Sequence, residues 1–283
     1  MSEEKNIHWF PGHMKRALIE AEDKAKLVDI IIEIVDARAP FSSRNIYLKS
    51  IGYNKPHLII LNKEDIALVR DRKIIDELRI NEDDVVIALS LVYKSARDKI
   101  IKEIEKIGKK KNDKYALKGM KPQPIRAMVL GIPNVGKSSL INLLAQRKSS
   151  GVANTPGFTR AQQWVNVTSK IELLDTPGIL PPNYEDQSIA MRLALIGAMR
   201  NESMPNNELC VEVIKYIKLN LIDQFNTHFN VNLNSESTYE EYIESVAKSR
   251  GYLLKGNTCD DAKTELLILR DFKDGAIGKV YLD

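Results

Sequence analysis

The chain has 283 residues, 43% of them hydrophobic, which suits one large or two ordinary domains with a sizeable buried core. Its net charge is only +4, it has no run near the ~18 consecutive apolar residues of a membrane span, and residues 1–14 lack a secretory signal pattern. The two cysteines, Cys210 and Cys259, fit neither a disulfide framework nor a metal-ligand spacing, so we expect a cytoplasmic protein with no membrane partner.

Short apolar runs that end in polar residues mark the predicted strands. They lie at 29–37, 57–62, 84–90, 125–131, 162–167 and 170–175. The first four runs are rich in β-branched residues, which is typical of buried parallel strands. Segments with helical spacing fall between them, at 67–79, 95–108 and 137–146. Strands that alternate with helices predict the α/β class, with a doubly wound and mostly parallel sheet.

The pattern changes near residue 205. The segments 207–220, 238–249 and 259–272 have helical spacing, and no convincing strand lies among them. The preceding sequence NESMPNNE is polar and rich in turn-forming residues, as expected of a join between domains. We therefore predict two domains, residues 1–204 and a small all-α domain of residues 205–283.

Charge is unevenly distributed along the chain. Residues 102–121 hold eight lysines and three acidic residues, whereas residues 205–283 hold nine basic and thirteen acidic residues. The lysine cluster has two interpretations: a surface for a nucleic-acid backbone, or a solvated linker or helix end.

Residues 131–138, GIPNVGKS, match the phosphate-binding pattern G-x-x-x-x-G-K-[ST] in full. The segment follows a predicted strand and opens a predicted helix, a context that makes a chance glycine turn a poor alternative. Backbone N–H groups and the positive end of the helix would face phosphate oxygens. Lys137 would neutralise the β and γ phosphates, and the Ser138 hydroxyl would bind Mg²⁺. The predicted nucleotide contacts here are Asn134, Val135, Gly136, Lys137, Ser138 and Ser139.

The sequence DTPG at 175–178 ends another predicted strand. Asp175 would hold Mg²⁺ through water, and the Gly178 N–H would meet the γ-phosphate. Thr159 lies in the loop between the two motifs and can supply a second hydroxyl to the metal. These loops would then be ordered only around a triphosphate, as in a nucleotide switch.

The sequence NKED at 62–65 follows an apolar strand and is typical of a guanine-reading segment. The Asp65 carboxylate can accept hydrogen bonds from the ring N–H and the exocyclic amine of guanine, and it repels adenine, which lacks both donors. The stem of Lys63 can cover the base, and Asn62 can tie the strand end to the phosphate loop. Glu64 completes the predicted nucleotide-binding set in this segment.

A further short element should touch the guanine oxygen. Ser90 and Leu91 follow the predicted strand at 84–90 directly and are our first choice. The pair Ser95 and Ala96 is the alternative.

The guanine-reading segment (62–65), the guanine reader, precedes the phosphate loop (131–138) along the chain, which is the reverse of the usual order. In an open parallel sheet, ligands bind at the carboxyl ends of the strands, whichever order the strands take along the chain. Circular permutation therefore preserves such a site if the old termini can be joined. The lysine-rich stretch 109–121 would be that join.

The order N-K-x-D, G-x-P-N-V-G-K-S, D-T-P-G resembles that of the circularly permuted GTPases. The sequences WFPGHM (9–14), VDARAPFSSRN (35–45) and PGFTRAQQWV (156–165) resemble the ribosome biogenesis GTPase A subgroup, also called YlqF. The resemblance covers almost the whole chain and is strongest from 8 to 200. It implies a cytoplasmic, monomeric GTPase that binds the immature large (50S) ribosomal subunit, promotes its late assembly and hydrolyses GTP to GDP there.

The C-terminal domain departs from what an rRNA-binding module should look like, because its net charge is negative. RNA contacts there would have to come from a local patch such as Lys248, Arg250 and Lys255. The sequence also leaves open whether Arg38 and Arg44 touch RNA or brace the fold.

Hydrolysis needs a group that orients water. Many GTPases place a glutamine after D-x-x-G, but Ile179 and Leu180 stand here and cannot hold water. His13 is the candidate, because an imidazole can orient a water toward the γ-phosphate, and the resemblance implies the same role. The residues alone favour the alternative, that His13 only stabilises a tight Pro-Gly turn, and the resemblance reverses that preference.

Asn134 also has two interpretations. It could be a K⁺ ligand beside the phosphates, as in related GTPases, or an ordinary loop asparagine.

Two other classes of function fit parts of the chain. A P-loop kinase for a small molecule would need an acceptor pocket, and Thr159, DTPG and NKED argue against it. An RNA-binding scaffold with a structural nucleotide would bind ribosomal particles equally well with GTP and GDP.

Overall fold

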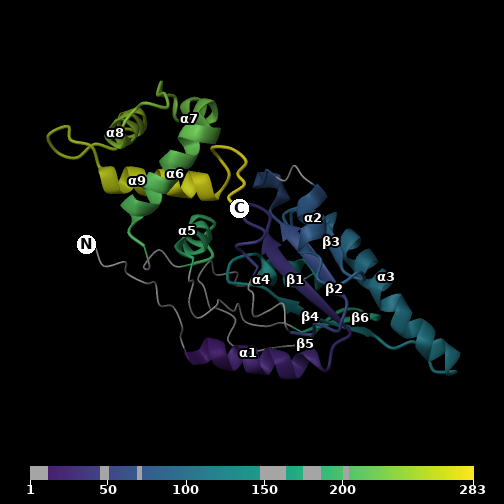
Figure 1. The fold of residues 1–283 in the computed structure, drawn as a ribbon. Coiled ribbons are helices and arrows are strands. Elements are labelled where there is room, and N and C mark those ends of the chain that lie inside the picture. Colours follow the sequence, from purple (N-terminus) through teal and green to yellow (C-terminus); the bar gives the residue numbers. More distant parts are fainter. Residues whose placement is uncertain (1–11, 45–50, 69–71, 147–163, 175–185, 200–203) are drawn as a thin grey trace.

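The computed structural model describes the backbone of residues 12–44, 51–68, 72–146, 164–174, 186–199 and 204–283. Side chains are described for the same residues except 12–18 and 72. Figure 1 shows a twisted sheet with its helices next to a group of helices formed by the C-terminal residues. The predicted succession of an α/β part and an all-α part is therefore present.

A six-stranded sheet forms the centre of the first part. Its strands are β1 (Ile30–Asp36), β2 (His57–Asn62), β3 (Val85–Ala88), β4 (Ile125–Leu130), β5 (Trp164–Thr168) and β6 (Ile171–Leu174). They lie in the order β3-β2-β1-β4-β6-β5. Strand β5 is antiparallel to β6, and the other pairs are parallel. The mostly parallel sheet that the sequence predicted is confirmed.

Helices cover both faces of the sheet. They are α1 (Gly12–Ala25), α2 (Arg72–Leu78), α3 (Ala96–Leu117) and α4 (Lys137–Leu144). Successive side chains of a strand point to opposite faces. Ile32 of β1 accordingly belongs to a buried cluster with Ile100 of α3, whereas its neighbour Ile31 belongs to a separate cluster with Ala21 of α1. The fold is doubly wound, as predicted.

Two helices differ from the predicted ranges. The helix expected at 95–108 continues to Leu117, so most of the lysine-rich stretch expected as a join is helical. The helix expected at 67–79 begins only at Arg72. Ala67 cannot join it because it forms a parallel β-bridge with Val280, near the C-terminus. A partner this distant in sequence leaves no local signal.

The helical region, as we call residues 205–283, contains four helices. They are α6 (Asn206–Asn220), α7 (Ile222–Phe229), α8 (Tyr239–Arg250) and α9 (Asp261–Lys273), and α5 (Gln187–Leu195) precedes them. The sequence did not predict α7, which Leu221 separates from α6 with a non-helical φ of −137°. Helix α8 begins with a capping box between Thr238 and Glu241, so local sequence fixes its start.

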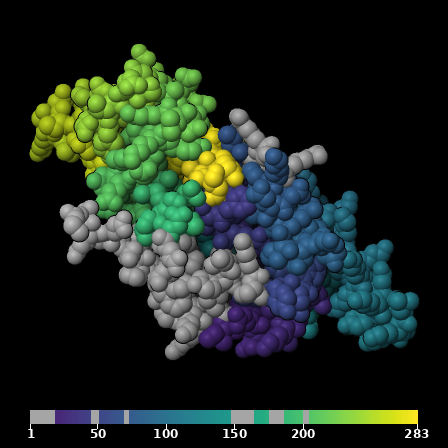
Figure 2. All heavy atoms as spheres, viewed as in Figure 1, coloured from purple at the N-terminus to yellow at the C-terminus, as the bar shows by residue number. Residues whose placement is uncertain are grey.

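One apolar core connects the two parts. Its buried side chains run from Ile34 of β1 through Met199 to Phe225 and Phe272 in the helical region. Figure 2 shows the C-terminal residues (yellow) lying directly against the sheet part (purple and blue). In the described part of the chain, no helix is both long and apolar enough to span a membrane.

Candidate nucleotide-binding site

The carboxyl ends of three parallel strands bring the predicted motifs together. Strand β1 lies between β2, which leads to the guanine-reading segment, and β4, which leads to the phosphate loop. Asp36, the last residue of β1, is paired in register with Asn62, the last residue of β2. Because all three strands are parallel, both motifs start at the same edge of the sheet, although the reader comes first in the chain.

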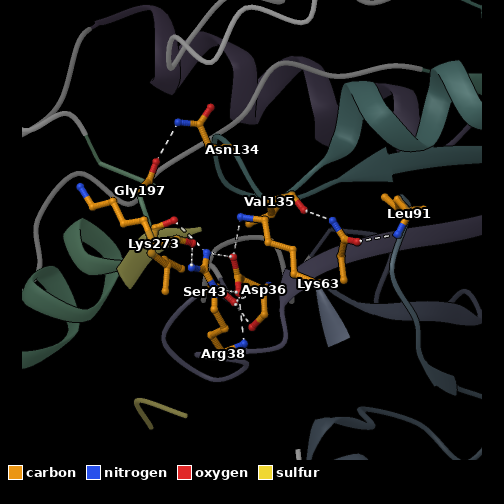
Figure 3. Close-up of polar contacts among 11 residues, drawn as sticks. Asp36, Arg38, Ser43, Lys63, Leu91, Asn134, Val135, Gly197 and Lys273 are labelled. Carbon is orange, nitrogen blue, oxygen red and sulfur yellow. Dashed lines mark hydrogen bonds and ion pairs between the residues drawn. The ribbon is translucent and has the colours of Figure 1, made fainter. Parts of the chain in front are cut away.

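Asn62 joins the two motifs directly. Its Nδ2 donates to the Val135 carbonyl oxygen in the phosphate loop, at 2.7 Å, and its Oδ1 accepts from the Leu91 N–H at 3.1 Å (Figure 3). The side chain is buried, so these bonds replace water. The contact between strand end and phosphate loop that the sequence predicted for Asn62 is present.

The phosphate loop has the backbone conformation that its glycine pattern predicts. Gly136 has a φ of +113°, and a Cβ there would collide with the Asn62 side-chain amide, so only glycine allows this close approach. Gly136 also caps the N-terminus of α4. Lys137 follows as the first helical residue, is buried, and donates from Nζ to the Ile132 carbonyl at 2.8 Å. Its ammonium therefore lies over the loop's own backbone, where phosphates would sit.

Asp65 carries a buried oxygen that needs a donor. It lies in the short 3-10 helix Glu64–Ile66, and its Oδ1 has no hydrogen-bond partner within the described residues. A buried carboxylate oxygen without a partner is unfavourable. Asp65 lines a cavity of about 320 Å³ at the end of β3. The N–H groups of guanine are donors that would satisfy this oxygen.

Both candidates for the element that touches the guanine oxygen lie near this cavity. Ser90, Ser95 and Ala96 all line it. Leu91, however, donates its N–H to Asn62, so this amide stabilises the guanine-reading segment (62–65). The next amide, that of Val92, makes only a long bond of 3.4 Å to Ser90 Oγ and is the better candidate donor.

Lys63 has an unusual backbone and a fixed ammonium. Its φ of +66° is left-handed, which is uncommon for a residue other than glycine. Its Nζ lies 2.9 Å from Asp36 Oδ2, and Arg38 bonds both oxygens of the same carboxylate. Burial of Asp36 favours its neutral form, but the charges and hydrogen bonds of Lys63 and Arg38 outweigh it and lower the Asp36 pKa below its ordinary value. Asp36 therefore stays ionised and anchors Lys63.

Similar proteins were found over the whole chain. Ribosome biogenesis GTPase A of Bacillus cereus is 38% identical over 98% of this chain and 93% of its own length. The protein belongs to the ribosome biogenesis GTPase A family. A mouse mitochondrial ribosome-associated GTPase 1 is 32% identical over 97% of this chain and 89% of its own length.

Other comparisons agree with membership of the ribosome biogenesis GTPase A family. A family model described as "50S ribosome-binding GTPase" matches residues 126–248. That match begins in β4, just before the phosphate loop, and leaves the guanine reader on its N-terminal side, as circular permutation requires. The solved structure of GNP-bound YlqF from T. maritima has the same fold, with a TM-score of 0.60, 24% identity and coverage of 95% of this chain and 97% of that one.

In this ribosome biogenesis GTPase A family member, Arg38 and Arg44 brace the fold. Arg38 is buried and donates to the carbonyl oxygens of Lys273 at 2.6 Å and Ile196 at 3.0 Å, besides its bonds to Asp36. Arg44 is also buried, paired with Glu33 of β1 at 2.7 Å. Neither guanidinium is placed to reach RNA.

Asn134 is held at the edge of the phosphate loop. Its Nδ2 donates to the Gly197 carbonyl oxygen at 2.7 Å (Figure 3). With the nitrogen engaged in this way, the amide oxygen is the atom that could ligate a cation. The geometry fits both interpretations of Asn134, the K⁺ ligand and the loop asparagine.

Several predicted residues lie outside the described part of the protein. They are Thr159, Asp175 and Gly178, and the side chain of His13, whose backbone is in the first turn of α1. Ser138 and Ser139 are described and follow Lys137 in α4. Among the described residues, no cluster of three His, Cys, Asp or Glu side chains could hold a metal.

Sequence reasoning missed two candidates for the site, Asp36 and Val92. Asp36 had a usable signal, because it is a polar residue at the end of the apolar run 29–37, as Asn62 is at the end of 57–62. Val92 had none, because its candidacy depends on Asn62 occupying the preceding amide.

Proposed function

We propose that this GTPase binds the immature large ribosomal subunit in a GTP-dependent way, promotes its late assembly, and hydrolyses GTP to GDP on the particle. The observation that supports the nucleotide half of this proposal is the buried bond from Asn62 to Val135, which fixes the guanine reader against the phosphate loop. The names of the relatives support the ribosomal half.

The residues of the site have separate tasks in this mechanism. Asp65 accepts from two N–H groups of guanine, Lys63 covers the base, and Lys137 neutralises the β and γ phosphates. The remaining contacts come from residues around them: Glu64, Ser90, Val92, Asn134, Val135, Gly136, Ser139 and Gly178.

A divalent metal fits the donors of the phosphate side. Ser138, Thr159 and Asp175 offer hydroxyl and carboxylate oxygens, the ligands that Mg²⁺ prefers. Mg²⁺ supplies charge compensation for the phosphates when bound. The amide oxygen of Asn134 would be one ligand of a K⁺ ion beside the phosphates, where the cation would offset phosphate charge.

His13 is proposed to orient the attacking water. His13→Ala should keep its affinity for GTP and lose the stimulation of turnover by large-subunit precursors, because binding depends on Asp65 and Lys137 instead. Turnover would be measured as phosphate release with and without particles. His13→Gln is the matched variant, since its amide can still hold a water and should retain part of the stimulation. Full stimulation of His13→Ala would remove this residue from the mechanism.

A basic face on α3 is proposed to meet the rRNA backbone. Lys102, Lys106 and Lys109 line a groove of about 600 Å³, together with Lys170 from the turn between β5 and β6. Lys102 and Lys109 have no ion-pair partner within the described residues. Lys106 and Lys170 are paired with Glu103 and Glu105. In the rival patch of the helical region, Lys248 is likewise paired with Glu244, and Arg250 donates to the His228 carbonyl.

Co-sedimentation with large-subunit precursors tests this face and the proposal as a whole. Binding should be tighter with a GTP analogue than with GDP; equal affinity would indicate a scaffold with a structural nucleotide. A Lys102→Glu, Lys106→Glu, Lys109→Glu variant should bind more weakly, with a log–log salt slope shallower by about two to three, because each phosphate contact contributes roughly 0.7–0.9. Charge reversal at Lys248, Arg250 and Lys255 should have the smaller effect. The opposite ranking would move the RNA contact to the helical region.

A further inference from the structure

The C-terminal tail, residues 274–283, returns from α9 to the guanine-reading segment. The Val280 N–H donates to the Ile66 carbonyl oxygen at 3.2 Å, and the Leu68 N–H donates to the Val280 carbonyl oxygen at 2.9 Å. Ala67 and Val280 form a parallel bridge between these bonds. The residues that follow Asp65 are therefore hydrogen-bonded to the last residues of the helical region.

Gly275 makes the closest approach between the tail and this segment. It has a φ of +74°, and a Cβ placed on it would lie 2.5 Å from Cγ2 and 2.6 Å from Cβ of Ile66. Ile66 is the residue directly after Asp65 and belongs to the same 3-10 turn. A side chain at position 275 would push against the turn that presents the Asp65 carboxylate.

A second connection reaches Lys63. Arg38 donates to the Lys273 carbonyl at the end of α9 and, on its other side, to the Asp36 carboxylate that fixes Lys63 Nζ (Figure 3). Asp36 and Arg38 are both almost fully buried, at 1% exposure. The two charged side chains expected to hold guanine are thus each attached to the end of the helical region, by separate routes.

We propose that the helical region positions Asp65 and Lys63, so that its placement sets the affinity for guanine nucleotide. A macromolecular partner that shifts the helical region would change the affinity of the site for the nucleotide. Bound nucleotide would in turn strengthen the contact between the C-terminal tail and the guanine-reading segment, because coupling between two sites is reciprocal. The inference rests on the proposed guanine site and adds to it a route by which the ribosomal particle could control nucleotide release.

A pair of glycine substitutions tests this coupling in the full-length protein. Gly275→Ala should raise the Kd for GDP about 5- to 20-fold, within the usual range of coupling between sites. Gly251→Ala is the control, because Gly251 has a similar φ of +67° in the helical region and a Cβ there meets nothing within 4 Å. Both variants carry the same backbone strain, so Gly251→Ala should change the Kd less than about twofold.

Inosine diphosphate separates a displaced Asp65 from a general loss of stability. It lacks the exocyclic amine that one Asp65 oxygen would accept from, so the ratio of the Kd values for inosine diphosphate and GDP reports on Asp65 alone. That ratio should fall in Gly275→Ala and stay at the wild-type value in Gly251→Ala. Equal Kd values and equal ratios in the two variants would overturn the coupling.

Hydrogen exchange on the wild-type protein gives an answer even if Gly275→Ala does not fold. GDP should slow exchange of the Val280 and Leu68 amides, which bond across the contact between tail and reader. Unchanged exchange of these amides, in a sample that binds GDP, would also overturn the proposal. A wild-type protein that does not bind GDP would instead refute the guanine site itself.

Discussion

Asp65→Asn is expected to lower the affinity for GDP by at least about 100-fold and to create affinity for xanthosine diphosphate. Hydrogen bonds to a charged partner contribute about 1.5–3 kcal/mol each, and Asp65 should accept two from guanine. Asparagine keeps the acceptor for the ring N–H but turns an amine toward the exocyclic amine of guanine. Xanthine carries a carbonyl oxygen at that position and can accept from the new amine.

The burial of one carboxylate oxygen of Asp65, Oδ1, is the reason to expect a change this large. Its Oδ1 lies out of contact with solvent and has no partner in the described residues, so no group there replaces a donor lost from guanine. Equilibrium binding of fluorescent GDP, with GDP, ATP and xanthosine diphosphate as competitors, measures the change. Asp76→Asn, on the exposed surface of α2, is the control and should bind GDP like the wild type. If Asp65→Asn kept its preference for GDP, Asp65 would not read the base.

Arg38→Met is expected to lower the free energy of unfolding by about 3–5 kcal/mol, the usual cost of removing one partner from a buried ion pair. Methionine fills much of the volume but leaves the carbonyl oxygens of Lys273 and Ile196 without their donor. It also leaves Asp36 with Lys63 as its remaining cationic partner. Urea unfolding followed by circular dichroism measures the loss.

The same variant should also shift acid unfolding. In the folded wild-type protein the pKa of Asp36 is lowered. Its ionised form therefore stabilises the folded state at pH values above the ordinary aspartate pKa of about 3.9. This contribution is lost as the pH falls through the pKa that Asp36 has in the folded state. Without Arg38 the folded-state pKa rises, and acid unfolding should begin at higher pH.

Two further variants provide reference values for the loss of stability expected in Arg38→Met. Arg44→Met breaks another buried pair, that of Arg44 with Glu33, and should cost a similar amount. Arg79→Met removes an exposed arginine 3.6 Å from Asp76 and should change stability by less than about 0.5 kcal/mol. An Arg38→Met protein that is stable and binds GTP like the wild type, yet fails to bind ribosomal particles, would make Arg38 an RNA contact instead of a brace.

The sequence by itself determined the fold class and predicted the place of the candidate site. Apolar runs with polar ends identified the six strands, and the rule that parallel strands present ligands at their carboxyl ends brought 62–65 and 131–138 together despite their order. Both features are local or follow from general topology. For the same reason the sequence identified Asn62 as the residue that ties the two motifs.

Only the tertiary structure decided what Arg38 does and how the reader is supported. The Arg38 partners Ile196 and Lys273 lie far along the chain, as does Val280, the partner of Leu68. Nothing in the pattern around VDARAP distinguishes an arginine that meets two backbone carbonyls from one that meets a phosphate, because the guanidinium offers the same donors to both. The burial of the guanidinium distinguishes a structural arginine from a phosphate-binding one. That burial depends on how the helical region packs against the sheet.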